Sequence, residues 1–130
     1  MFMNLTKEMS IPRIEEFLSN KNDFVKIDYL TRFLREKLPG ATRKFVFLNL
    51  GEIYERSSMF TDSGRAFETA GELASEPEKR RLLVKAAQIF ARAGDFTRAE
   101  GLIRTAVSKA SDFDKMEIYR GIKEFYIYTA

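Results

Sequence analysis

The sequence predicts an all-α protein made of three stacked helix pairs and one closing helix. A period of 36 residues supports this prediction, because Phe24, Phe60 and Phe96 follow one another at that spacing. Two positions before each phenylalanine stands a small or turn-tolerant residue, namely Asn22, Ser58 or Gly94. A fixed period between about 20 and 50 residues is typical of proteins that stack one supersecondary unit repeatedly. The three phenylalanines therefore mark the same bend in three successive units.

Four columns of apolar residues precede the bends at the same spacing. Within one unit their members fall at i, i+3, i+6 and i+7, which places them on one face of a helix. The columns are Ile11/Phe47/Leu83/Tyr119, Ile14/Leu50/Ala86/Ile122, Phe17/Ile53/Ile89/Phe125 and Leu18/Tyr54/Phe90/Tyr126. After each bend, a second helix is amphipathic through Leu30/Ala66/Leu102 and Leu34/Ala70/Ala106. Each unit is thus expected to be helix A, a tight turn and helix B, with these columns as the core.

Turn and capping residues set the expected helix boundaries. Pro39-Gly40 ends helix B of the first unit. Gly94 suits the left-handed residue that ends a helix, Asp95 or Thr97 can cap the next helix, and Thr97 with Glu100 forms a capping box. We expect helices at about 11–21, 24–38, 42–57, 60–74, 78–93, 96–110 and 113–128. At this length the chain is one domain over 1–130, with repeats at about 9–44, 45–80 and 81–116 and a closing helix at 113–128.

Composition excludes several classes of function. With no Cys and no His, the chain cannot form a disulfide framework, a Cys/His zinc site or a Cys/His nucleophile pair, so we expect no metal and no cofactor. No carboxylate pair stands out from the charged surface, so we expect no enzyme. The longest apolar runs, such as Phe45–Leu48 and Phe125–Tyr128, are far shorter than the roughly 20 residues that cross a bilayer. Residues 1–5 show no secretory leader, so we expect a cytoplasmic protein without a membrane partner.

Two segments resemble the tetratricopeptide repeat family. Asn49–Tyr54 is similar to its N-L-G-x-x-Y segment of helix A, and Ala93–Glu100 is similar to its G-D-Y-x-x-A turn into helix B. Ala70 and Ala106 match the family's small residue in helix B. The unit is two residues longer than usual, and the family's signature tryptophan is absent. The resemblance covers residues 11–128 and implies a right-handed superhelix of antiparallel helix pairs.

The resemblance also implies a non-enzymatic interaction scaffold whose helix-A faces line a concave groove for a protein or peptide segment. By position, the groove residues are Pro12, Glu16, Ser19, Leu48, Asn49, Glu52, Arg56, Val84, Lys85, Gln88 and Arg92, with Arg120 and Glu124 from the closing helix. One column is acidic or amide in every unit, namely Glu16/Glu52/Gln88/Glu124. This column favours a basic or amide-rich ligand. The alternative is that Glu52 and Arg56, or Gln88 and Arg92, are only i,i+4 surface pairs.

Two other binding modes of such a scaffold need different residues. Asn49 and Lys85 match two places in a set that grips C-terminal carboxylates in some family members, but Leu48 and Glu52 depart from it, so this grip is not expected. A pentatricopeptide-like RNA-binding repeat would need a continuous basic face. Basic residues do gather at the unit junctions, namely Arg43, Lys44, Lys79, Arg80 and Arg81. Glu76, Glu78 and the acidic column weaken the positive electrostatic field of these residues, and the net charge is only +3. Nucleic acid is therefore the alternative partner and not the expected one.

The closing helix predicts self-association. Repeat arrays normally end in a polar outer face. Here apolar residues remain beyond the expected inward stripe Tyr119/Ile122/Tyr126, namely Ile118, Phe125, Ile127 and Tyr128. We expect a homodimer through this helix, or a partner protein that docks on it. The alternatives left open are that this end folds onto the N-terminal segment or that the chain is a fragment.

Overall fold

The computed structural model describes residues 4–108 and 115–120, and this part of the chain is helical with no strand. Its helices are α1 (Ile11–Leu18), α2 (Asp23–Phe33), α3 (Gly40–Arg56), α4 (Phe60–Leu73), α5 (Glu78–Arg92) and α6 (Phe96–Val107). Residues 115–120 form a further short helix. The all-α prediction is confirmed. Within the described ranges no helix has both the length and the apolar character that a bilayer crossing requires.

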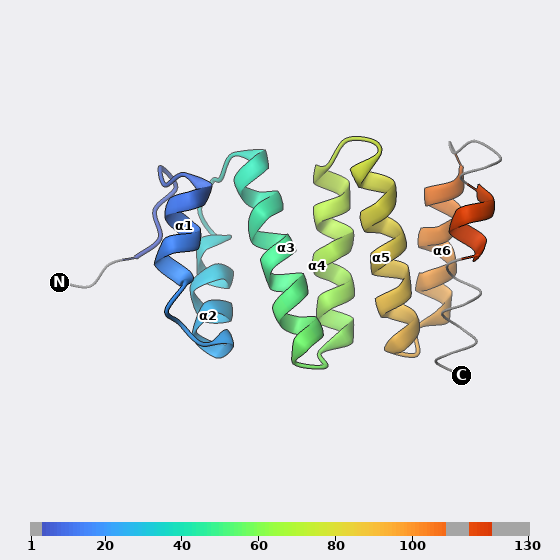
Figure 1. The fold of residues 1–130 in the computed structure, drawn as a ribbon, viewed down its shortest axis with the longest axis horizontal. Coiled ribbons are helices and arrows are strands. Elements are labelled where there is room, and N and C mark those ends of the chain that lie inside the picture. The colour runs from blue at the N-terminus through green and yellow to red at the C-terminus, as the bar shows by residue number, and fades with distance from the viewer. Residues whose placement is uncertain (1–3, 109–114, 121–130) are drawn as a thin grey trace.

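From α3 to α6 the helices form a row in chain order in which neighbours run antiparallel, and α1 and α2 overlap at one end of this row (Figure 1). Helix A of the three units is α1, α3 and α5, and helix B is α2, α4 and α6. The turns inside the pairs lie along the lower edge of the row in Figure 1, and the links from α2 to α3 and from α4 to α5 lie along the upper edge. Contacts between α3, α4, α5 and α6 are extensive, whereas α2 meets α3 over a shorter stretch.

The predicted bend has the same backbone geometry in the second and third units. Ser58 has a φ of 59° and Gly94 a φ of 84°, so both lie in the left-handed region. In both units the next residue donates its N–H to the carbonyl oxygen five residues earlier, at 2.8 and 2.9 Å. This is the hydrogen bond that closes a Schellman motif at a helix C-terminus. The first unit bends differently, because Asn22 is extended and caps α2 by accepting the N–H of Val25 at 2.9 Å.

Two boundary predictions needed correction. The side chain of Asp95 caps α6 by accepting the N–H of Arg98 at 3.1 Å, and Thr97 lies inside that helix. The capping box at Thr97 is therefore wrong. Helix α2 ends at Phe33 rather than near residue 38. In the turn that follows, backbone N–H groups donate to the carbonyl oxygen three residues earlier, which ends the α-helical pattern. Leu38 then folds into the core.

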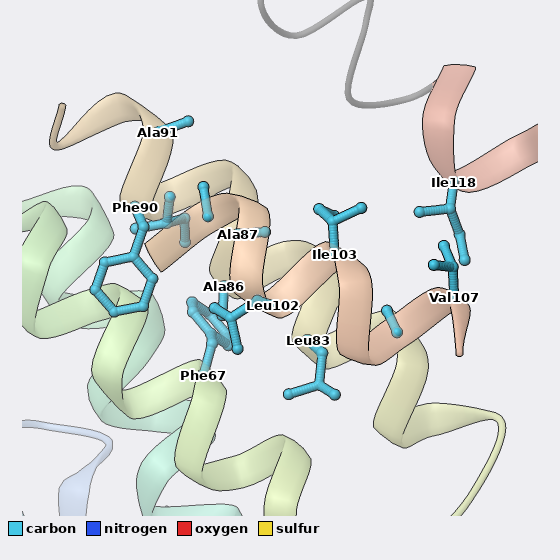
Figure 2. Packing of buried hydrophobic residues seen from close by; sticks show 13 residues of the cluster. Phe67, Leu83, Ala86, Ala87, Phe90, Ala91, Leu102, Ile103, Val107 and Ile118 are labelled. Atoms are coloured by element: carbon cyan, nitrogen blue, oxygen red, sulfur yellow. The ribbon is translucent and has the colours of Figure 1, made fainter. Parts of the chain in front are cut away.

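The buried side chains form two clusters that meet at α4. The first cluster joins α1, α2 and α3 and includes Ala66 of α4. The second includes the neighbouring Phe67 and joins α4, α5, α6 and Ile118 (Figure 2). Described members of the predicted columns supply much of both clusters, namely Ile14, Leu18, Leu30, Leu50, Ile53, Ala66, Leu83, Ala86, Ile89, Phe90, Leu102 and Ala106. The prediction that these column residues form the core is confirmed, although the core is divided into two clusters.

Phe24, Phe60 and Phe96 each stand in the first turn of a helix B, as the period requires, but their exposure differs. The Phe24 side chain is 87% exposed and that of Phe96 is 51% exposed, whereas Phe60 is half-buried against the second cluster. The guanidinium of Arg92 covers the Phe60 ring at 4.3 Å from its centroid. The equivalent Arg56 instead binds Asp23, which leaves Phe24 uncovered.

Two aromatic rings from later helices fill the space over two helical glycines. A Cβ added at Gly51 would lie 2.8 Å from the Phe67 ring, and one at Gly64 would lie 2.9 Å from the Phe90 ring. The absence of a side chain at these two positions therefore lets α3, α4 and α5 approach closely. This packing fixes the spacing of α3 and α5, the two helices that carry most of the predicted groove.

Candidate partner-binding face

The candidate site is the helix-A face, defined here as the outward sides of α1, α3 and α5. Among its predicted residues, Pro12, Glu16, Ser19, Glu52, Arg56 and Arg92 are exposed, whereas Leu48, Asn49, Val84, Lys85 and Gln88 are half-buried. Leu48 and Val84 pack against the second core cluster, so they serve the core and offer a ligand little surface. The amide nitrogen of Asn49 donates to the carbonyl oxygen of Phe45 at 2.9 Å.

Ion pairs tie α3 to α5 along this face. At one end Lys44 Nζ lies 2.7 Å from Glu78 Oε1. At the other end the Glu55 carboxylate receives Lys85 Nζ at 3.2 Å and an Arg92 guanidinium nitrogen at 3.5 Å. The two cations predicted to face a ligand from α5 therefore share one carboxylate of α3, which offsets one of their two charges.

The same two cations rest on aromatic rings. Lys85 Nζ lies 5.6 Å from the centroid of the Phe67 ring, and the Arg92 guanidinium lies 4.3 Å from that of Phe60. A cation within about 6 Å of a ring centroid is attracted by the quadrupole of the ring. Lys85 and Arg92 are thus held between a carboxylate and an aromatic face, in fixed directions along the helix surface.

Arg56 is directed away from the predicted groove and toward α2. Its guanidinium donates to both carboxylate oxygens of Asp23, at 3.1 and 3.4 Å. The hydrogen bond from Arg56 lowers the pKa of Asp23, against a smaller opposing effect of desolvation. The same bond raises the pKa of Arg56. Both groups are therefore charged throughout the neutral range.

These ion pairs bear on the two interpretations of the acidic column. Arg56 forms its ion pair with Asp23 and Arg92 forms its ion pair with Glu55, and the charge of the Glu52 carboxylate also raises the pKa of Arg56. In the described ranges, the side chains of Glu16, Glu52 and Gln88 form no hydrogen bond or ion pair. Glu16 and Gln88 thus lie on the helix-A face without such a contact, whereas Glu52 lies near the charge of Arg56, whose ion pair is with Asp23. The fourth, Glu124, lies outside the described residues.

Sequence reasoning missed the residues that neutralise the cations. Glu55 precedes Lys85 by 30 residues, and Asp23 precedes Arg56 by 33. Neither separation matches the spacing of residues on one helix face, so no local sequence pattern reveals these ion pairs. Both ion pairs join residues of consecutive units of the 36-residue array. The repeat period is therefore the sequence signal that points to them.

The closing helix requires a correction. Ile118, predicted on the outer self-association surface, is buried in the second core cluster and points toward Val107 (Figure 2). Tyr119, predicted on the inner stripe, is 52% exposed. The predicted positions of Ile118 and Tyr119 are therefore exchanged, and Ile118 packs on the apolar surface at the end of α6. Arg120 is exposed and binds Glu117 at 3.2 Å, while Phe125, Ile127 and Tyr128 lie outside the described residues.

The junction cations on which an RNA-binding alternative depends are partly engaged by the protein itself. Lys44 binds Glu78. Arg43 donates to the carbonyl oxygen of Leu34 at 3.4 Å, and its guanidinium lies 5.6 Å from the centroid of the Phe47 ring. The Glu78 carboxylate offsets the charge of Lys44 and so reduces the positive field that phosphate groups would need, whereas the partners of Arg43 are neutral and leave its charge in place.

Comparison of the chain with protein-family models, with curated proteins and with solved structures gives no match.

Proposed function

We propose that this protein is a non-enzymatic, cytoplasmic interaction scaffold of the tetratricopeptide-like type, which binds a segment of another protein on its helix-A face. One observation carries the proposal. The side chains of Glu16, Glu52 and Gln88 form no hydrogen bond, while the cations Arg56, Lys85 and Arg92 form ion pairs with Asp23 and Glu55. The face therefore offers oxygen acceptors to a ligand.

The chemistry of these acceptors defines the ligand. Carboxylate and amide oxygens accept hydrogen bonds from Lys and Arg, and an amide also pairs with Asn or Gln. Hydrogen bonds to a charged group contribute about 1.5–3 kcal/mol each. The ligand we propose is therefore a basic or amide-rich segment, as the sequence predicts.

The helix-A face repeats one acceptor per unit, on α1, α3 and α5. Ion pairs join α3 to α5 across this face. A polyproline II segment returns to the same side every third residue after about 9 Å, so it presents donors at a regular spacing. We propose that a segment of this kind, with a donor at every third residue, meets Glu16, Glu52 and Gln88 in succession.

Two labelled peptides of identical composition test this spacing. One carries Lys at every third position between Pro and Ala, and the other carries the same number of Lys in one block. Fluorescence anisotropy should show tighter binding of the spaced peptide. Equal affinity for both peptides would mean that the contact is a diffuse charge effect, and the proposed groove would be rejected.

Paired charge reversals test the location. The double variant Glu16→Lys and Glu52→Lys should abolish binding of the spaced peptide. The control is Glu72→Lys with Glu100→Lys, which makes the same change of charge at exposed positions of α4 and α6 and should leave binding within about twofold, because distant exposed charges are screened. Equal losses in both variants would contradict the assignment to the helix-A face.

A further inference from the structure

A cleft of about 240 Å³ opens on the other side of the array, between α2 and α4. The buried or half-buried side of α3 forms its floor, and polar residues of α2 and α4 form its rim. Its lining residues are Thr31, Leu34, Phe47, Leu50, Tyr54, Asp62, Arg65, Ala66 and Thr69. Burial of the Tyr54 hydroxyl and the nearby Asp62 carboxylate raise the pKa of Tyr54, which agrees with a site partly shielded from water.

Comparison of successive units shows which side chain the cleft lacks. Thr31 lines the cleft and is exposed. The equivalent residue one unit later is Phe67, whose side chain is only 4% exposed in the second core cluster. Ala66 lies in the cleft wall, and its equivalent one unit later is Leu102. The second unit therefore has a larger side chain at this position as well. The first unit is therefore short of one phenyl ring at a position where the second unit has one.

A phenyl ring without a partner stands on the same side of α2. Phe24 is 87% exposed and precedes Thr31 by seven residues, which is two helical turns or about 10 Å. Phe24 keeps this exposure because Arg56 binds Asp23 and does not cover the ring. An apolar ring and a cleft that lacks one thus lie side by side on one surface of the molecule.

From this arrangement we propose that two copies of the chain associate with the Phe24 ring of each in the α2–α4 cleft of the other. A two-fold interface requires that a residue and its receptor lie on one continuous surface, so that the same contact forms twice. The adjacency of Phe24 and Thr31 meets this requirement. This dimer does not depend on the proposed function of the helix-A face.

Sedimentation equilibrium of the full chain tests the proposal. The wild-type protein should show a monomer–dimer equilibrium, and Phe24→Ser should weaken association by about thirtyfold or more, the usual effect of removing a buried aromatic anchor. Because Phe24 is exposed in the monomer, Phe24→Ser should keep the melting temperature that the wild-type protein has at concentrations where it is monomeric. The repeat-equivalent substitution Phe96→Ser should leave association unchanged. A wild-type monomer at every concentration tested, or equal losses in both variants, would overturn the proposal.

In a second variant, a side chain of the same molecule fills the cleft. Thr31→Phe places in the first unit the ring that Phe67 supplies in the next, so this variant should stay folded and be monomeric. Mixed together, Phe24→Ser and Thr31→Phe should form a heterodimer that neither forms alone, since one protein keeps the cleft and the other keeps the ring. Dimerisation of Thr31→Phe alone, or no association in the mixture, would show that the cleft does not receive Phe24.

Discussion

Ser63 of α4 donates a 2.7 Å hydrogen bond to the backbone carbonyl oxygen of Gly51 in α3, and the Ser63 side chain is fully buried. The bond joins the two helices at the point where the Phe67 ring also packs on Gly51. A polar contact and an aromatic contact therefore hold the second helix pair together at one place.

Ser63→Ala should lower the free energy of unfolding by about 0.5–1.5 kcal/mol, the usual net contribution of one hydrogen bond. Urea denaturation measures this change. Thr69→Ala is the control, because the Thr69 hydroxyl bonds only to the carbonyl oxygen of Arg65 within α4. If both variants lose the same stability, the bond between α3 and α4 has no special role.

Gly51→Ala and Gly64→Ala should each destabilise the fold by about 1–3 kcal/mol, because the new methyl group would collide with a packed ring. The gain in helix propensity, about 1 kcal/mol, offsets part of this loss. Gly101→Ala is the control, since nothing lies within 4 Å of its added Cβ, and it should stabilise α6 by up to about 1 kcal/mol. Thermal unfolding of the three variants provides the comparison, and similar shifts at all three sites would contradict the close packing.

The pair of Asp23 and Arg56 should stabilise the fold only above a certain pH. Arg56 lowers the pKa of Asp23 below its ordinary value of 3.8, so unfolding raises the affinity of this carboxylate for protons. The stabilisation is complete above the unfolded-state pKa and is lost as the pH falls through the folded-state pKa. Asp23→Asn should therefore cost about 0.2–1 kcal/mol at neutral pH and nothing at a pH where both states are protonated. A double-mutant cycle with Arg56→Gln measures the coupling, and a coupling that persists in strong acid would refute the ion pair.

Glu55→Gln should release Lys85 and Arg92 from their shared carboxylate. We expect a loss of about 0.2–1 kcal/mol in the free energy of unfolding, smaller at high salt because these groups are partly exposed. On the proposed function, the freed cations should also weaken binding of the Lys-spaced peptide. Glu100→Gln, an exposed site on α6, should change neither quantity. Unchanged peptide affinity in Glu55→Gln would count against the acceptor column as the ligand site.

The helix pairs, their bends and most of the core could be predicted from the sequence because each depends on a local pattern. Ser58 and Gly94 occupy the same left-handed position since one bend recurs with the period. Which face of the helix over residues 115–120 is buried could not be predicted, because a shift of one residue decides whether Ile118 or Tyr119 is buried. The neutralisation of Lys85 by Glu55 also escaped prediction, since the distance between residues of different units is set by how closely the helices pack.

The position of α4 between the two core clusters has a consequence for how the chain unfolds. Neighbouring residues of this helix, Ala66 and Phe67, belong to different clusters, so loss of α4 opens both at once. Many stacked repeats unfold gradually from their ends, since each unit contacts only its neighbours. Here the central helix couples both ends of the row, and denaturation should proceed as a single cooperative transition.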